Sequence, residues 1–235
     1  MEKNGEKQLK HYATVTGLFV AVLLISNIAS TKLALIGPFV LDGGTILFPL
    51  AYIFGDILTE VYGYKKARKV IWTGFFAALI MSIVFAIVGA LPSAPGWESQ
   101  GAFDAILGVV PRIVLASLIA YFAGEFSNSF VLAKMKIWSK GKDLWKRTIG
   151  STIVGQGIDT TLFTFIAFWG VFPLETFVSL IVSNYIFKVG VEILFTPITY
   201  KIVNFLKKEE GEDYYDHNTD FNPFTLSDNA KTLKQ

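Results

Sequence analysis

The chain has 235 residues, of which 52% are hydrophobic, 15% aromatic and only 17% charged, and its mean hydropathy is +0.49. Globular proteins carry roughly 25% charged residues, so this composition predicts a membrane-embedded unit rather than a soluble domain. The absence of cysteine excludes disulfides, thiol nucleophiles and cysteine-ligated zinc. The formal net charge of +2 is too small to indicate nucleic-acid binding.

Six apolar stretches are each long enough to cross the hydrocarbon of a bilayer, which takes about 20 helical residues. They are predicted at residues 12–33, 44–63, 69–91, 109–133, 148–170 and 176–204. We therefore expect an all-α, polytopic membrane protein built as a bundle of six transmembrane helices. Residues 12–206 would form the membrane domain, after a short N-terminal segment at 1–11. The polar residues 207–235 cannot bury enough apolar surface to fold alone, so a mostly disordered tail is expected there.

The basic residues predict the orientation of the bundle. All but Lys32, Arg112 and Lys188 of the 21 Lys and Arg residues lie at the N-terminus, in alternate loops, or beyond residue 200. Basic residues concentrate on the cytoplasmic side of a membrane protein. We therefore expect both termini in the cytoplasm.

Ionisable and amide side chains inside the predicted spans are the candidate functional residues. Each costs at least a few kcal/mol within a bilayer, so such groups usually face the bundle interior or a wet cavity. Helical spacing places those of one span on a common face. The candidates are Asn27 in the first span, Asp56 and Glu60 in the second, Glu125 and Asn128 in the fourth, Gln156 and Asp159 in the fifth, and Asn184 and Lys188 in the sixth; the aromatic Phe163 joins them because it shares one face with Gln156 and Asp159.

The third span carries no charge between residues 70 and 90, so it is expected to face lipid beside a central polar cavity. Two candidates have a purely structural alternative. Glu60 is near enough to Lys65 and Lys66 for an interfacial ion pair. Lys188 has the option of pairing with Asp159, or with Glu192 a turn further on, only to neutralise buried charge.

Enzyme chemistry is disfavoured. The two histidines lie outside the spans, and no GxxxxGK[ST] loop is present, so the chain does not itself hydrolyse ATP. A hard-cation site on the acids stays open, although the neighbouring amides and aromatics suit a larger organic ligand better. No cofactor is expected. A transporter of a small solute remains.

Four segments carry small and polar residues in a distinctive order. They are Ser26-Asn27 with Lys32; Asp56-Ile-Leu-Thr-Glu60-Val-Tyr62-Gly63 with Ala67-Arg68; Gly124-Glu125-Phe126-Ser127-Asn128-Ser129; and Arg147-Thr-Ile-Gly150-Ser151 through Gly155-Gln156-Gly-Ile-Asp159-Thr160. Together they resemble the queuosine precursor transporter family, also called the vitamin uptake transporter family, over residues 12–205. The resemblance implies import of 7-deazaguanines such as preQ0, preQ1 or queuine, which are then inserted into tRNA as queuosine.

Such a base suits these residues on independent grounds. Its guanine-like edge presents N1–H beside an exocyclic amine, and one carboxylate, Asp159 or Glu125, can accept from both. The amides of Asn27, Asn128, Gln156 and Asn184 offer donors and acceptors, and Phe163 offers a stacking face. The expected partners are therefore this small molecule and the lipid bilayer.

Three questions stay open at this point. Buried Asp56, Glu60 or Glu125 could carry a proton, or uptake could be facilitated diffusion. The chain could be a monomer or a homodimer. The alternative function is the substrate-binding membrane subunit of an energy-coupling-factor transporter, which needs a separate ATPase.

Overall fold

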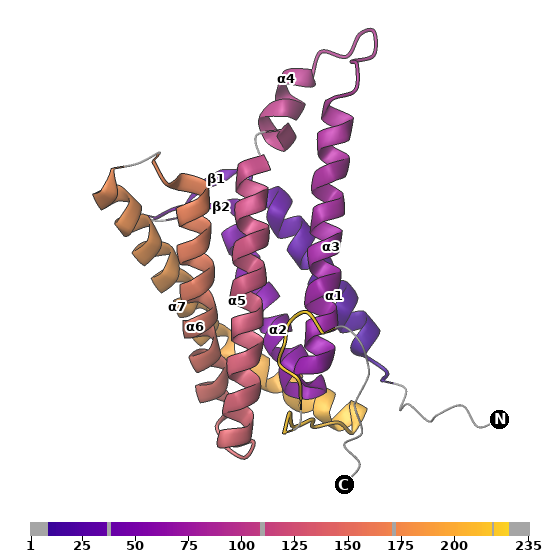
Figure 1. Cartoon of the computed structure of the whole chain (residues 1–235), viewed down its shortest axis with the longest axis vertical. Helices are drawn as coiled ribbons and strands as arrows, with labels where there is room; N and C mark the ends of the chain where they lie inside the picture. The colour runs from indigo at the N-terminus through magenta and orange to yellow at the C-terminus, as the bar shows by residue number, and fades with distance from the viewer. Residues whose placement is uncertain (1–8, 37–38, 109–110, 171–172, 218, 226–235) are drawn as a thin grey trace, which may run out of the picture.

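The computed structural model describes residues 9–36, 39–108, 111–170, 173–217 and 219–225 (Figure 1). Within these residues, one long helix corresponds to each of the six predicted stretches. These helices are α1 (Tyr12–Ala29), α2 (Phe48–Tyr62), α3 (Tyr64–Gly89), α5 (Pro111–Trp138), α6 (Leu144–Phe168) and α7 (Leu174–Glu210). The shorter elements are β1 (Leu33–Ile36), β2 (Phe39–Asp42), the 3-10 turn η1 (Gly43–Ile46), α4 (Gln100–Phe103) and the π turn η2 (Asp104–Gly108).

The hairpin of β1 and β2 departs from the expected all-α fold. Its strands are antiparallel, with Leu33 opposite Asp42 and Ile36 opposite Phe39. The first predicted span also ends early, because α1 stops at Ala29 and the backbone N–H of Gly43 donates to the carbonyl of Lys32 at 2.7 Å. The apolar run in the sequence thus continues beyond the helix into a strand, a change that hydropathy alone does not reveal.

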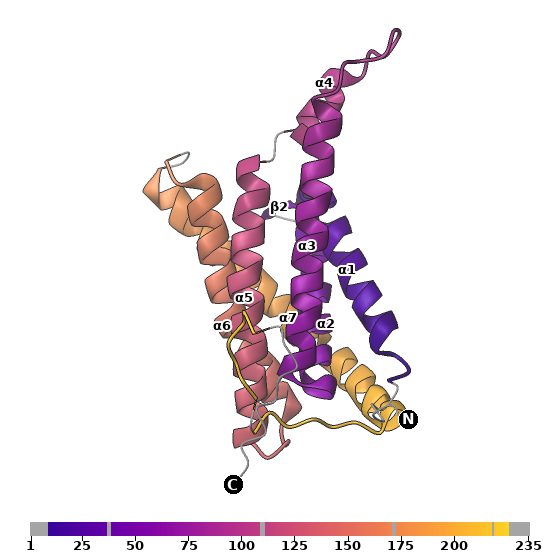
Figure 2. The ribbon, with the colours of Figure 1, turned by 45° about the vertical axis from the view of Figure 1, so that its right-hand side comes forward.

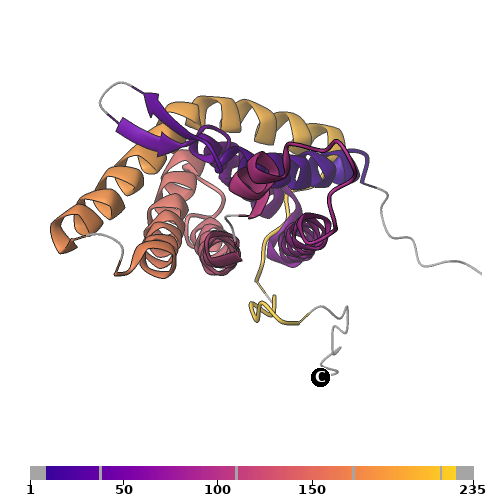
Figure 3. The same cartoon turned by 90° about the horizontal axis from the view of Figure 1, so that it is seen from above.

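The helix α2 lies in the middle of the bundle and packs against α1, α3, α5 and α7. Seen from above, α3, α5 and α6 lie in one row, while α7 runs obliquely along the other side (Figure 3). We call the end of the bundle where α1 begins and α7 ends the tail end. The opposite end, which carries the hairpin and α4, is the hairpin end (Figure 2).

The surface of the bundle is largely apolar, and its interior holds many polar side chains beside an apolar core, unlike the interior of a soluble protein. Ile80 on α3 and Leu194 on α7 are 61% and 73% exposed, whereas Asp56 and Glu125 are fully buried. Four helical segments of the described chain are long and apolar enough to cross a membrane: Tyr12–Ala29, Tyr64–Gly89, Leu115–Trp138 and Phe177–Glu210. The chain therefore has the features of a multi-pass membrane protein.

The helices α2 and α6 lie outside that set for different reasons. With 15 residues, α2 is short and surrounded by other helices. The helix α6 has 25 residues, but it carries Arg147 and a row of hydroxyl and amide side chains. The six-span count consequently stays a prediction, as does the cytoplasmic location of both ends.

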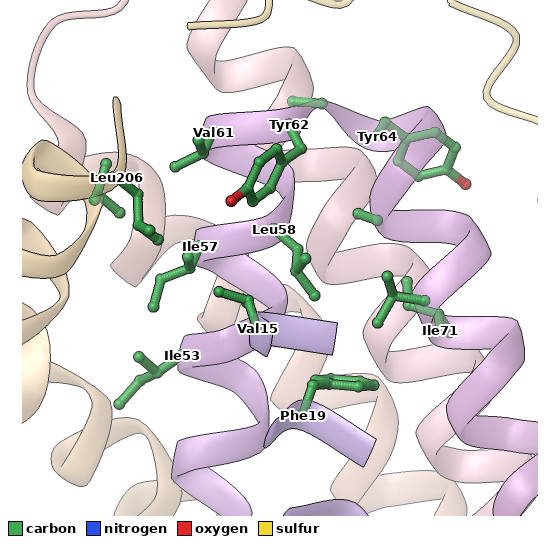
Figure 4. Close-up of a cluster of buried hydrophobic side chains, with 14 of the residues drawn as sticks. Val15, Phe19, Ile53, Ile57, Leu58, Val61, Tyr62, Tyr64, Ile71 and Leu206 are labelled. Carbon is green, nitrogen blue, oxygen red and sulfur yellow. The ribbon is translucent and has the colours of Figure 1, made fainter. Parts of the chain in front are cut away.

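A hydrophobic core joins the first three long helices near the tail end. Val15 and Phe19 of α1 lie between Ile57 and Leu58 of α2 and Ile71 of α3 (Figure 4). Burial in α3 is confined to residues 64–78, and the apolar side chains after residue 79 are mostly exposed. The exposed apolar surface of α3 is therefore concentrated in its second half, whereas we expected the whole span to face lipid.

The described residues of the segment 211–225, for which the composition predicts a disordered tail, pack against the tail end, and residues 226–235 of that predicted tail lie outside the described residues. The Asp216 carboxylate accepts the backbone N–H of Tyr64 at 3.0 Å. The Arg68 guanidinium donates to the carbonyls of Asp220 and Asn222 at 2.8 and 2.6 Å. The bundle supplies these partners, so the segment needs no core of its own.

One glycine allows this docking. Gly63, between α2 and α3, has a backbone φ of +85°, which residues other than glycine rarely adopt. A Cβ atom there would also lie 2.2 Å from Cδ1 of Tyr214. The backbone N–H of Tyr214 reaches the carbonyl of Val61 at 3.3 Å, so the tail crosses the α2–α3 junction directly.

Candidate functional site

Four helices direct polar side chains into the middle of the bundle, and we call this set the polar layer. All of its members are buried, and the most exposed of them, Lys188, exposes 8% of its surface. They are Asp56 on α2, Glu125 and Asn128 on α5, Gln156, Asp159 and Thr160 on α6, and Lys188 and Glu192 on α7. The helical spacing that predicted a shared face within each span thus brings four of these faces together.

Close contact between α5 and α6 fixes part of the polar layer. A Cβ atom on Gly124 would lie 2.7 Å from Cβ of Asp159, and one on Gly155 would lie 2.7 Å from Cβ of Asn128. The two backbones approach because neither glycine has a side chain. A pattern of small residues four apart, Ala120 with Gly124 and Ser151 with Gly155, is the sequence signal by which this contact can be found.

An ion pair between Asp159 and Lys188 lies at the hairpin-end side of the polar layer. Nζ of Lys188 is 3.0 Å from Oδ2 of Asp159, and their side chains are 9% and 4% exposed. Lys188 therefore pairs with Asp159, one of the two partners that the sequence left open. Buried charge of this kind is tolerated when it is paired and hydrogen-bonded.

The ion pair lines a cavity of about 50 Å³, which holds roughly one or two water molecules. Of the predicted residues, Asn27 and Phe163 also line it. Tyr121 lines it too and was missed in the sequence, although it lies one helical turn before Glu125. Asn27 is half-buried and donates from Nδ2 to the carbonyl of Leu23 at 2.9 Å.

One turn closer to the tail end, the acids of the polar layer have few partners. Oδ1 of Asp56 accepts from Nδ2 of Asn128 at 2.7 Å. Oδ2 of Asp56 and both carboxylate oxygens of Glu125 and Glu192 have no hydrogen-bond partner within the described chain. The Glu125 carboxylate lies over Gly55 of α2, where a Cβ atom would be 1.8 Å from Oε1. These acids are buried without compensation, which is costly for a charged group.

Glu60 belongs to a different group, which we call the ion cluster. Its Oε2 pairs with Arg147 of α6, and its Oε1 lies 2.6 Å from Nζ of Lys207 and 3.6 Å from Nζ of Lys136. Asp213 completes the cluster, 2.6 Å from Lys136 and 2.9 Å from Lys207. Glu60 therefore lies in an ion cluster outside the polar layer, with partners distant in the sequence rather than Lys65 and Lys66. Its predicted contact with a substrate stays a prediction.

The electrostatics of Asp213 fit this cluster. Partial burial would raise the pKa of its carboxyl, but hydrogen bonds from Lys136 and Lys207 outweigh that effect, so the pKa lies below its usual value.

The two remaining candidates, Gln156 and Asn184, lie in different surroundings. Gln156 is buried in the polar layer, and its Oε1 has no partner among the described residues. Asn184 is half-buried on α7. It does not line the cavity beside the Asp159–Lys188 pair, nor a second, larger cavity.

That larger cavity, of about 510 Å³, opens between α1, α3, η2 and α5. Its wall is mostly apolar, with side chains such as Leu79, Phe85 and Leu115, and Asn27 is the one predicted residue that it shares. An apolar wall gives a polar solute few hydrogen bonds. The smaller cavity above the polar layer is therefore the better candidate site.

A helical bundle with an apolar surface and a buried polar cavity is the architecture of a membrane transporter. The family model described as "Putative vitamin uptake transporter" matches residues 42–202. The chain belongs to this family. The match leaves out α1 with Asn27 and the docked segment 211–225.

Three relatives carry related names. The chain is 31% identical to a "Probable queuosine precursor transporter" of Bacillus subtilis (strain 168), over 71% of this chain and 73% of the relative. It is 29% identical to the "Queuosine precursor transporter" of Escherichia coli (strain K12), over 70% and 74%. A "Probable queuosine precursor transporter" of Haemophilus influenzae is 31% identical, over 71% and 70%. No solved structure matches the chain.

Proposed function

We propose that this protein imports queuosine precursors, 7-deazaguanine bases such as preQ0, preQ1 or queuine, across the bacterial inner membrane. In this proposal six helices span the membrane, and the tail end faces the cytoplasm. Besides family membership, one observation carries the proposal: the buried Asp159–Lys188 pair in the wall of the small polar cavity.

The ion pair offers donors and acceptors that complement a guanine-like edge. The ammonium of Lys188 would donate to O6, while the carboxylate of Asp159 would accept from N1–H and the exocyclic amine. We prefer Asp159 to Glu125 for this contact because Asp159 lines the cavity, whereas Glu125 lies a turn deeper. Phe163 would stack on the ring of the base, and the amide of Asn27 would form a hydrogen bond with a further polar atom of the ring.

The size of the cavity supports a moving carrier rather than an open channel. A bicyclic base does not fit into about 50 Å³, so the walls must separate before it binds. On the tail-end side the ion cluster joins α2, α5, α6 and α7 through Glu60, Lys136, Arg147 and Lys207. Release of the base into the cytoplasm would require these contacts to open.

The test is uptake in bacteria that cannot make preQ0 and lack their own importer. We expect the chain, supplied with low concentrations of each precursor, to restore queuosine in tRNA, and Asp159→Asn to abolish this. Loss of one charged hydrogen-bond partner costs about 1.5–3 kcal/mol, or roughly 10- to 100-fold in affinity. Unchanged uptake and affinity in Asp159→Asn would contradict the proposed site.

Two controls sharpen this test. The double variant Asp159→Asn with Lys188→Met removes the unpaired buried cation, so its stability should recover while its uptake stays lost. Uptake by the purified chain in lipid vesicles without any ATPase would exclude the energy-coupling-factor alternative. Uptake that appears only with a co-purified ATPase would support that alternative instead.

A further inference from the structure

Three acids of the polar layer have no cation to neutralise them. Lys188 pairs with Asp159, and no ion pair within the described chain involves Asp56, Glu125 or Glu192. Five of their six carboxylate oxygens have no hydrogen-bond partner, although the residues are at most 1% exposed. An uncompensated carboxylate at such a position costs at least a few kcal/mol, so it is cheaper for the group to bind a proton.

The surroundings of Glu125 strengthen this argument. Its titratable neighbours are Asp56 and Tyr52 on α2, Asp159 on α6 and Glu192 on α7, while Tyr121 lies on its own helix. If all four acids were ionised, only one of the four negative charges would have a cationic partner. Like charges that share a low-dielectric site disfavour ionisation further. The described residues also include no group of three His, Cys, Asp or Glu side chains arranged to hold a metal ion.

We propose that Glu125, with Asp56 and Glu192 beside it, is a proton-binding site that couples uptake of the base to proton entry. This inference rests on the proposed function and adds its driving force. A proton from the outer solution binds a carboxylate oxygen of Glu125 while the bundle is open on the hairpin end. The proton stays there in the closed state described above, and it is released when the tail end opens to water.

Position favours this role for Glu125. It lies one helical turn below Tyr121, which lines the cavity, and its carboxylate contacts the backbone of α2 at Gly55. Protonation of Glu125 removes the charge repulsion with Asp56 and Glu192 and so lets α2, α5 and α7 approach. Return of the charge would separate them. The proton thus acts on the same helix contacts that must open and close during transport.

The first test needs no substrate. In the protein reconstituted in lipid at neutral pH, infrared spectroscopy should show the carbonyl stretching band of a protonated carboxyl group. We expect Glu125→Gln to weaken this band, and the matched change Glu98→Gln, in an exposed loop residue, to leave it intact. Absence of the band in the unaltered protein would overturn the proposal, whether or not the base is the substrate.

The second test measures coupling, with radiolabelled preQ0 as the probe. In vesicles that are more acidic outside by one pH unit, one-to-one coupling allows up to about tenfold accumulation, which a protonophore should abolish. Glu125→Gln mimics the protonated acid, so it should retain exchange of preQ0 at equal pH but lose accumulation. Accumulation by Glu125→Gln, or exchange without accumulation by the unaltered protein, would overturn the proposal. If the infrared band is present but preQ0 is not exchanged, the proton site stands and the proposed substrate fails.

Should Glu125→Gln fail to fold, Asp56→Asn and Glu192→Gln provide the same comparison. Each removes one acid of the group and keeps its shape. We expect either variant to weaken the infrared band and to reduce accumulation more than exchange. Variants that fold and accumulate preQ0 fully would overturn the shared proton site.

Discussion

Asp56 and Glu60 lie four residues apart on α2, both fully buried, yet their surroundings are opposite. Glu60 has cations on both carboxylate oxygens, supplied by Lys136, Arg147 and Lys207. Asp56 has one amide donor, from Asn128, and its other oxygen has no partner within the described chain. One helical turn therefore separates a neutralised acid from an uncompensated one.

This difference separates structure from function. A neutralised buried acid holds helices together, and removing it leaves cations without a partner. An uncompensated acid lowers stability, so its presence calls for a ligand or a proton that bears on function. The sequence places both residues in the same apolar span with the same spacing, and it does not distinguish them.

The largest expected effect comes from breaking the ion cluster. Glu60→Ala leaves Arg147 and Lys136 as buried cations without their shared carboxylate, which costs about 3–5 kcal/mol. We expect a strong drop in the thermal midpoint of the detergent-solubilised protein and in its yield. Glu98→Ala, at an exposed acid, is the control and should melt like the unaltered protein. A Glu60→Ala protein of normal stability would show that the cluster does not hold the tail end.

Asp56→Asn should affect transport rather than stability. The amide keeps an oxygen that accepts from Asn128 and resembles the protonated carboxyl in shape and charge, so the stability should change by less than about 1 kcal/mol. We expect accumulation of the base to fall while the thermal midpoint is kept. A stability loss as large as that of Glu60→Ala would remove the distinction between the two acids.

Overpacking the α5–α6 contact should lower stability less than Glu60→Ala does. A Cβ atom on Gly124 would lie 2.6 Å from the hydroxyl oxygen of Tyr52 and 2.7 Å from Cβ of Asp159, so Gly124→Ala must push the helices apart. We expect this to lower the free energy of unfolding by about 1–3 kcal/mol. Its matched control is Gly190→Ala on α7, where nothing lies within 4 Å. There the change should be neutral or stabilising by up to about 1 kcal/mol. Thermal unfolding of both variants tests the contact.

The smallest effect is expected at the docked tail. Because Asp213 is 45% exposed, Asp213→Asn should weaken docking by less than about 1 kcal/mol. The pKa of Asp213 is lowered in the folded protein, so its contribution is present at neutral pH and is lost as the pH falls through that lowered pKa. At neutral pH, the backbone amides of residues 211–217 should exchange hydrogen faster in the variant than in the unaltered protein. In the unaltered protein, exchange should speed up only in strong acid. Equal protection in both proteins at neutral pH would contradict this role.

The sequence by itself determined the broad class of this protein. The apolar runs predicted where the long helices lie, because an apolar segment in a bilayer must satisfy its backbone hydrogen bonds within itself, and a helix does so. The cost of burying charge identified Asp56, Glu125, Asp159 and Lys188 as interior residues before any contact was known. Family motifs in the same stretches agreed with the later match over residues 42–202.

Only the tertiary structure decided which of these residues interact. The pairing of Lys188 with Asp159 depends on how α6 and α7 cross, and the cations on Glu60 come from residues 76, 87 and 147 positions away. The docking of 211–225 was equally hidden, because its partners are backbone and side-chain groups of the bundle rather than of the tail. Hydropathy and helical spacing describe one element at a time. Compensation of a buried charge is instead a property of two or more elements in contact, and it exists only once they have packed.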